Sequence, residues 1–426
     1  MANPSLASDP GFNPILLALP SLTPSLALEV LPYGVTLHRL YVQADGKTHD
    51  ILIGPEAPAE HLTQKYTNTI IGRYANRVPS GTHTFSRNGF TATLNAKHNE
   101  SPDVSLHGGI TGYDLVPWEP LIDPYSAKLF TQAEIQTIQS EIPASCIFTR
   151  VSPDGEEGYP GKLLVEVLVG LLQPQSPPTK EDTEYNLGSV LLNYRAKLLD
   201  ANTVTPINLT QHWGFNLDAS LQEGLSVKDH KLVIKANNTV ALQNNFLSTG
   251  VLSPVKGTQH AHSDKSTGKI GENWPERGYD EFYVFAPRLT PAPTRVAESE
   301  LKSSVDLVKA AIDASAPGRD SVVELESDRS GLRLAFDTNQ SGVQFYTNNG
   351  SDPSKTARKK IHGGSGSKGD GYDAGSAAFL EFHEPLAAWL HPETQGSSGS
   401  DTLLASGEIY NNFVRMDVWY KSPTPL

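Results

Sequence analysis

The chain has 426 residues, of which 38% are hydrophobic and 19% are charged, a balance typical of a soluble globular protein rather than a disordered one. Its 47 acidic side chains outnumber its 34 basic ones, which gives a formal net charge of -13. This excess of negative charge argues against nucleic acid or an anionic membrane surface as a partner.

Cysteine usage and the N-terminal residues indicate a compartment. Cys146 is the single cysteine, so no intrachain disulfide can form, which favours a reducing environment. The apolar stretch 13–20 lacks a basic flank, contains proline and is far shorter than a membrane span. We therefore expect a cytoplasmic protein with no signal peptide and no contact with the membrane.

Short runs of β-branched and aromatic residues, separated by glycine and proline, predict many strands joined by turns. In chain order the clearest runs are 163–172, 190–198, 231–235, 331–336, 343–346 and 413–420. In the last run Val414, Met416 and Val418 alternate with Arg415 and Asp417, the period of a half-buried strand. The pattern predicts an all-β fold, a large antiparallel β-sandwich in which residues 1–426 form one domain.

Helical patterns are scarce. Residues 299–314 predict one short surface helix, because apolar side chains recur there at helical spacing, at Leu301, Val305, Val308 and Ile312. Pro317 and Gly318 would close this helix. Segments 173–184 and 363–376 are rich in proline or in glycine and serine, which predicts loops.

Three short patterns match sequence motifs of known functional sites but lack the structural context that those sites require. The glycines of 364–369 match a dinucleotide-binding loop, yet no strand precedes them and no helix follows. His260 and His262 have no third ligand at a usual spacing, so we expect no metal site. Glu381 and Glu384 resemble a glycosidase carboxylate pair, but positions three apart on a strand face opposite ways.

Four segments combine hydrogen-bonding side chains with glycine turns in a way that packing alone does not require. They are 71–77 (IGRYANR), 105–109 (SLHGG), 154–161 (DGEEGYPG) and 205–217 (TPINLTQHWGFNL). Singly, each has an ordinary explanation, such as a surface ion pair for Arg77 or core burial for His212. Their joint occurrence in this order is the informative observation.

This order continues with matches at 229–230, 249–250, 278–280, 342–346, 379–381 and 403–408. From about residue 33 to 420 it resembles the aldose 1-epimerase, or galactose mutarotase, family. The resemblance implies a large antiparallel β-sandwich of the galactose mutarotase type that interconverts the α and β anomers of a free aldose such as galactose or glucose. It also implies that no cofactor is used and that the partner is a small monosaccharide. We expect a monomer or a homodimer.

By the same resemblance His212 is the general acid and Glu381 the general base. The sugar hydroxyls would be held by Asn76, Arg77, His107, Asp280 and Gln344. The pairing suits the reaction, because ring opening takes a proton from the anomeric hydroxyl and gives one to the ring oxygen. A carboxyl and an imidazole, with ordinary pKa values of about 4.3 and about 6.5, can divide these tasks. Aromatic side chains usually cover the apolar faces of a pyranose, so Trp213, Trp274 and Tyr279 are candidate platforms for the sugar, and packing in the core or at its rim is the alternative.

The chain departs from the family pattern at two places. Where the family usually reads His-Ser-Tyr-Phe-Asn, residues 212–216 read His-Trp-Gly-Phe-Asn, so the tyrosine that commonly touches substrate is absent at Gly214. After Glu381 the usual Thr-Gln is replaced by Phe382 and His383, and Glu384 would raise the pKa of Glu381 if the two carboxylates were close. Segments 121–143, 286–322 and 363–376 are longer than their usual counterparts.

Two other functions remain open on the sequence. The first is a carbohydrate-binding or regulatory protein that keeps the cleft without turnover. The second is an epimerase of phosphorylated hexoses, which would need a larger basic cluster than Arg73 and Arg77 to hold the phosphate. A glycoside hydrolase has less support, because the expected acid is a histidine rather than a second carboxylate.

Overall fold

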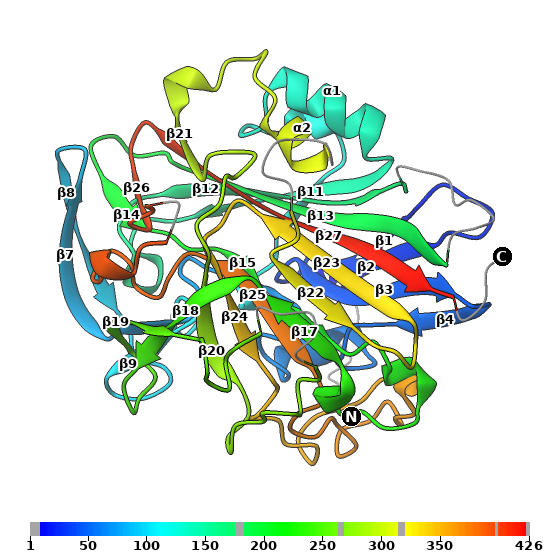
Figure 1. Cartoon of the computed structure of the whole chain (residues 1–426). Coiled ribbons are helices and arrows are strands. Elements are labelled where there is room, and N and C mark those ends of the chain that lie inside the picture. The colour runs from blue at the N-terminus through cyan, green and yellow to red at the C-terminus, as the bar shows by residue number, and fades with distance from the viewer. Residues whose placement is uncertain (1–8, 175–182, 263–267, 314–319, 397–398, 423–426) are drawn as a thin grey trace.

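The computed structural model describes residues 9–174, 183–262, 268–313, 320–396 and 399–422, and strands dominate it (Figure 1). Within these residues every pairing between named strands is antiparallel, which confirms the expected all-β fold. Near the N-terminus a four-stranded sheet is formed by β1 (Ile15–Ala18), β2 (Leu26–Leu31), β3 (Thr36–Ala44) and β4 (Lys47–Asp50).

Two larger sheets follow. The nine-stranded sheet consists, in spatial order, of β10 (Glu119–Leu121), β11 (Ala144–Ser152), β12 (Leu163–Leu172), β13 (Glu184–Leu198), β27 (Glu408–Lys421), β23 (Leu332–Thr338), β22 (Val323–Glu326) and β17 (Lys231–Ile234), with β21 (Arg295–Ala297) beside β27. The six-stranded sheet consists of β16 (Gly214–Phe215), β25 (Ala378–His383), β24 (Gly342–Tyr346), β20 (Asp280–Phe285), β18 (Ala236–Leu242) and β19 (Ser248–Pro254).

Shorter strand pairs connect these sheets. They are β14 (Val204–Pro206) with β26 (Leu403–Ala405), β15 (Thr210–Gln211) with β5 (Ile70–Ile71), β6 (Arg77–Pro79) with β9 (Val104–Leu106), and β7 (Gly81–Arg87) with β8 (Phe90–Ala96). All six strands expected from the sequence are present, as β12, β13, β17, β23, β24 and β27.

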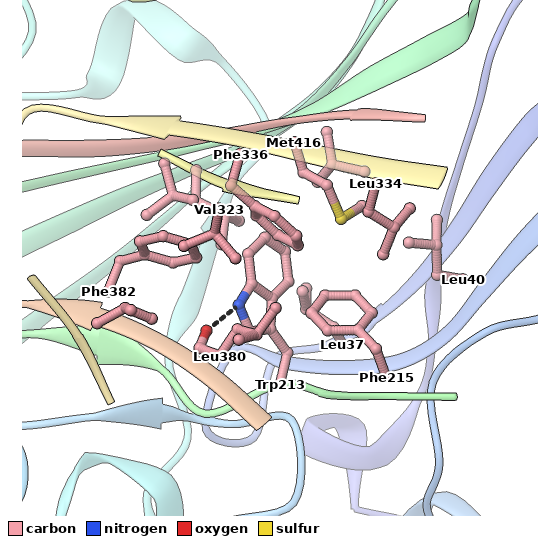
Figure 2. Packing of buried hydrophobic residues seen from close by; sticks show 14 of the residues in the cluster. Leu37, Leu40, Trp213, Phe215, Val323, Leu334, Phe336, Leu380, Phe382 and Met416 are labelled. Carbon is pink, nitrogen blue, oxygen red and sulfur yellow. Dashed lines mark hydrogen bonds between the residues drawn. The ribbon is translucent and has the colours of Figure 1, made fainter. Parts of the chain in front are cut away.

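Trp213 lies at the centre of the core between the sheets, fully buried (Figure 2). Its indole N–H donates to the Leu380 carbonyl at 2.7 Å, so burial leaves no polar group unpaired. Its ring packs against Phe336 of β23, which in turn lies 5.2 Å from the ring of Phe382 on β25. This cluster fixes the nine-stranded sheet against the six-stranded one, and so positions the strand that carries Glu381.

The outer face of the nine-stranded sheet is also apolar, and two helices cover it. Alternate side chains of β12 point there, including Leu168 and Leu172, and they pack with α1 (Gln132–Glu141) and α2 (Leu307–Ile312). Fully buried Glu134 of α1 pairs with Arg195 of β13 at 2.6 Å. Helices α1 and α2, which belong to the long segments 121–143 and 286–322, therefore lie together on this face (Figure 1).

The helices differ from the expectation. The predicted helix 299–314 is reduced to α2, which begins only after Asp306 because that carboxylate accepts the Lys309 N–H at 2.7 Å and caps the first turn. Helix α1 was not predicted. Its start carries a capping box in which the side chains of Thr131 and Glu134 each accept from the other residue's backbone N–H.

Segment 363–376 contains no helix or strand, as expected, whereas most of 173–184 lies outside the described residues.

Candidate active site

One cleft with a volume of about 1310 Å³ lies on the face of the six-stranded sheet that carries Gln344 and Glu381. Its walls come from segments far apart in the sequence: 53–67, 76–77, 100–107, 274–281 and 344–356. All seven site residues expected from the sequence line it, namely Asn76, Arg77, His107, His212, Asp280, Gln344 and Glu381. The fold thus brings together side chains that are separated by up to 305 positions in the chain (76 to 381).

The backbone around His212 is held on both sides. Its N–H donates to the Thr69 carbonyl at 2.9 Å, and its own carbonyl accepts the Asn68 N–H at 2.8 Å. Because neighbouring side chains on extended backbone face opposite ways, Trp213 points into the core while His212 lines the cleft.

The acidic side of the cleft lies on three adjacent strands. Glu381 of β25 sits opposite Gln344 of β24 in the strand register, and Asp280 begins β20 on the other side of β24. The Gln344 side-chain amide donates to Asp280 at 2.7 Å, which orients both groups. Sheet register, rather than loop geometry, therefore positions these three side chains.

His212 and Glu381 are in direct contact. The His212 Nε2 atom lies 3.2 Å from Glu381 Oε1, and the two residues are 8% and 2% exposed. Burial lowers the pKa of His212 to about 4 and raises the pKa of Glu381 well above its usual value. The negative charge of Asp280 raises the Glu381 pKa further, and Arg77 opposes this effect. Both shifts favour the state in which Glu381 carries the proton and His212 is neutral.

His107 completes a group of two imidazoles and one carboxylate. Its Nδ1 accepts the backbone N–H of Asn76 at 3.2 Å, so its proton sits on Nε2. Burial, followed by the nearby His212 and Arg77, lowers the pKa of His107 well below its usual value. His107 is thus a neutral hydrogen-bond donor whose ring lies 5.2 Å from that of His212.

Arg77 links two carboxylates at the rim. It donates to both oxygens of Glu100, at 2.7 and 2.8 Å, and lies 3.9 Å from Asp280. Its guanidinium also stacks 4.8 Å from the ring centroid of Phe246. These contacts fix Arg77 and place a positive charge next to Asp280 and Glu381.

Left-handed backbone concentrates along the cleft. Five non-glycine residues with φ between 53° and 64° line it: Tyr66, Asn76, His107, Phe246 and Asn348. Asparagine and histidine adopt this conformation more readily than other side chains, but it is unfavourable for Tyr66 and Phe246 and persists where the surrounding structure requires it. Strain of this kind is typical of sites built to bind a ligand.

Two of the three candidate aromatic platforms pack in the core instead. Trp213 and Tyr279 are fully buried in the core, and the Tyr279 hydroxyl donates to the carbonyls of Gln259 and Asn273. Trp274 does line the cleft. Proximity to His212 or Asp280 in the sequence does not say which face of the chain a ring takes.

The departures at Gly214 and Phe382 leave the His212–Glu381 pair intact. A Cβ atom at position 214 would lie 2.6 Å from the Phe379 ring, so glycine there lets this ring pack 4.8 Å from that of His212. Phe382 points into the core. Glu384 bonds the Ser341 hydroxyl and is absent from the causes that shift the Glu381 pKa, so the expected coupling of these carboxylates does not contribute.

The cleft also contains side chains that the sequence did not reveal, among them Tyr66, Tyr346 and Phe379. Phe379 could have been found, because positions 379 and 381 share one face of a strand. Tyr66 lies in an irregular turn outside the matching motifs, so no periodic pattern in the sequence predicts its place in the cleft.

Metal ligation is a second chemical possibility for the same group. Among the described residues, His107, His212 and Glu381 bring three ligand atoms within 4.8 Å of one another. Two imidazoles and a carboxylate are a donor set that Zn²⁺ accepts. The His260 and His262 pair does not form such a group; His260 Nδ1 instead lies 3.0 Å from the Tyr283 hydroxyl.

Comparison with known proteins decides the family. The family model described as aldose 1-epimerase matches residues 22–416. The chain belongs to the aldose 1-epimerase family. Mouse galactose mutarotase is 30% identical over 76% of this chain and 75% of its own length, and the rat galactose mutarotase is 29% identical over 93% and 91%.

Solved structures agree in fold. A homologue of the aldose epimerases from Caenorhabditis elegans matches with a TM-score of 0.66 at 20% identity, covering 95% of this chain and 98% of that one. Galactose 1-epimerase from Lactobacillus acidophilus matches with a TM-score of 0.62 at 17% identity, with the same coverage. The galactose mutarotase-type β-sandwich expected for this epimerase family member is thereby confirmed.

In the described part of this aldose 1-epimerase family member, no helix has the length and hydrophobicity needed to cross a bilayer.

Proposed function

We propose that the protein interconverts the α and β anomers of a free aldohexose such as galactose or glucose, without a cofactor. The observation that carries the proposal is the 3.2 Å contact between His212 and Glu381 inside a cleft lined by hydrogen-bonding side chains. The named relatives, galactose mutarotases and an aldose 1-epimerase from Escherichia coli, support this choice of reaction.

The single proton of the pair supports both halves of the reaction. Its transfer from Glu381 to His212 gives a carboxylate beside an imidazolium. The carboxylate takes the proton of the anomeric hydroxyl while the imidazolium protonates the ring oxygen, and the bond between the ring oxygen and the anomeric carbon breaks. After rotation of the open-chain aldehyde the same transfers run backwards, which closes the ring on the other face.

The remaining residues orient the sugar in this proposal. His107 Nε2–H donates to an oxygen on which negative charge develops, as a preorganised hydrogen-bond donor. Asn76, Arg77, Asp280 and Gln344 hold the other hydroxyls. Buried Glu381 Oε2 and Gln344 Oε1 have no hydrogen-bond partner in the described part of the chain, and sugar hydroxyls would satisfy them.

The charges of the cleft favour a neutral sugar over a phosphorylated one. Arg73 lies outside the cleft and donates to the Gly161 carbonyl at 2.9 Å and the Pro160 carbonyl at 3.0 Å. Five cationic side chains and six carboxylates line the described part of the cleft. The cleft therefore has no net positive charge with which to bind a phosphate group. The cations are Lys65, Arg77, Lys228, Arg277 and Lys355.

Polarimetry tests the proposal. Freshly dissolved α-galactose and α-glucose should reach their equilibrium rotation faster with the protein. Glu381→Gln and His212→Asn should each reduce the added rate at least about 100-fold, because positioned proton transfer typically contributes about 10² to 10⁴. The exposed residues Glu119 and His98 supply matched controls, Glu119→Gln and His98→Asn, which should act like wild type.

Saturable sugar binding by calorimetry without any acceleration would reject the isomerase and select the carbohydrate-binding alternative. Residues 1–426 as one domain, a monomer or homodimer, and a cytoplasmic location remain predictions.

A further inference from the structure

Three tyrosines line the cleft in the described residues, and their hydroxyls differ in one respect. The Tyr346 hydroxyl accepts the Gly350 N–H at 2.7 Å. The Tyr372 hydroxyl accepts the backbone N–H of Lys359 at 3.3 Å and lies 2.7 Å from His362 Nδ1. The Tyr66 hydroxyl has no hydrogen-bond partner among the described residues. Tyr66 is thus the one tyrosine of this cleft whose hydroxyl forms no hydrogen bond with the described residues.

The Tyr66 ring packs against both imidazoles of the site. Its centroid lies 4.7 Å from that of His107 and 6.3 Å from that of His212. The ring thus shares a wall with the proposed acid and with the proposed hydrogen-bond donor. A sugar that reaches His107 and His212 also reaches the edge of Tyr66.

The backbone at Tyr66 is held in a conformation that a bulky residue does not choose. Its φ is 64°, in the left-handed region. Asn68, two residues on, anchors the turn: its side chain donates to the Ile53 carbonyl at 2.7 Å and accepts the Gly214 N–H at 2.8 Å. On the other side Gln64 exchanges two hydrogen bonds with the backbone of Ala357.

The turn is also tied to the proposed acid itself, because the Asn68 N–H donates to the His212 carbonyl at 2.8 Å. The same hydrogen bonds that place the His212 imidazole therefore place Tyr66. A glycine at position 66 would adopt this backbone without strain, so keeping a tyrosine there points to a task for its side chain.

We propose that Tyr66 contacts the substrate: its hydroxyl hydrogen-bonds a hydroxyl of the bound aldose, and its ring supports the His107 and His212 rings. This inference rests on the proposed sugar-isomerising function and adds a specificity-determining residue to it. Burial, followed by the charges of Asp114 and Glu100, raises the pKa of the Tyr66 phenol well above its usual value, so the group keeps its proton and can donate.

Tyr66→Phe is the first test, because it removes the hydroxyl and keeps the ring. We expect kcat/KM for galactose to fall about three- to tenfold, the usual effect of one lost neutral hydrogen bond, with the loss carried by KM. Its pH profile should match wild type. Tyr66→Leu also removes the ring and lets water reach His212. The pKa of His212 should then rise, and the low-pH limb of the activity profile should move to higher pH.

A series of deoxygalactoses identifies the contact. Wild type should lose activity on each sugar that lacks a contacted hydroxyl. One sugar of the 2-, 3-, 4- and 6-deoxy series should lack the hydroxyl that Tyr66 contacts. On that sugar Tyr66→Phe should be as active as wild type, because the hydrogen bond is already absent. Tyr125→Phe is the control: this tyrosine is 53% exposed, its hydroxyl donates to Gln139, and the variant should act like wild type throughout.

The outcomes separate this inference from the proposed function. Unchanged kcat/KM in Tyr66→Phe, or an equal loss on galactose and on every deoxy sugar, overturns the role of Tyr66 while the isomerase stands. A wild-type protein that binds galactose without isomerising it overturns the proposed function alone. In that case the Kd values of the same variants for the same sugars, measured by calorimetry, test whether Tyr66 contacts the sugar. Wild type that neither binds nor isomerises any of these sugars overturns both.

Discussion

The contact between His212 and Glu381 sets the pH range in which the site can work. Between the pKa of His212, about 4, and the strongly raised pKa of Glu381, the pair holds one proton. A second proton removes the base as the pH falls through about 4. Loss of the remaining proton removes the acid as the pH rises past the pKa of Glu381. We predict a bell-shaped pH dependence of kcat/KM, and a profile that lacks either limb would contradict this assignment.

Asp280 provides a check on which group forms the upper limb. Its negative charge raises the pKa of Glu381, so Asp280→Asn should lower that pKa and move the upper limb to lower pH. The exposed Asp229 supplies the matched control, and Asp229→Asn should leave the limb in place. An upper limb that stays fixed in Asp280→Asn would mean that another group titrates there.

The donor set of His107, His212 and Glu381 also allows a direct test of metal dependence. Since the proposed proton transfers use only side chains of this chain, dialysis against a chelator should leave the rate of anomer interconversion unchanged. Activity that disappears on chelation and returns with added Zn²⁺ would instead mean that these three side chains hold a metal.

At the level of elements, the segment 347–377 forms one wall of the cleft and is fixed by a buried ion pair. Lys359 Nζ donates to Asp50 at 2.7 Å and to the carbonyls of His38 and Leu52, with both charged side chains fully buried. Tyr372 and Thr356 of the same segment line the cleft. The residues just before the predicted glycine-rich loop 363–376 are thus tied to the N-terminal sheet.

Lys359→Met should destabilise the fold by about 3 kcal/mol, because it leaves Asp50 buried without its closest partner. KM for the sugar should rise as the wall loosens. Chemical denaturation and sugar kinetics check the two effects. Lys309 pairs with Glu141 on the surface, so Lys309→Met should cost less than about 1 kcal/mol and leave KM unchanged. Equal stability losses in the two variants would contradict the role assigned to Lys359.

Strands were easier to predict than helices in this chain, for a physical reason. The run 163–172 is apolar except for Glu166 and Gly170, and the structure buries all of β12 because helices cover its outer face. Helix α1 is weakly amphipathic, and only its Thr131–Glu134 capping box marks it. The expected helix 299–314 had apolar spacing but lacked a cap until Asp306, so only its last turns form.

For the whole molecule, the sequence predicted which residues gather but not the environment that they create. The seven expected site residues line one cleft because the six-stranded sheet and the turns beside it converge there. The raised pKa of Glu381 comes from burial beneath several distant segments, and no local pattern contains that information. The same is true of Tyr66, which reaches the imidazoles only through the folded turn 63–69.

The most direct measurement is a double-mutant cycle on the pair, with anomer exchange of galactose followed by nuclear magnetic resonance at equilibrium. Because His212 and Glu381 exchange one proton as a unit, Glu381→Gln and His212→Asn should each slow exchange at least about 100-fold. The double variant should be no slower than the slower single variant. Multiplicative losses, or wild-type exchange in either single variant, would contradict the account.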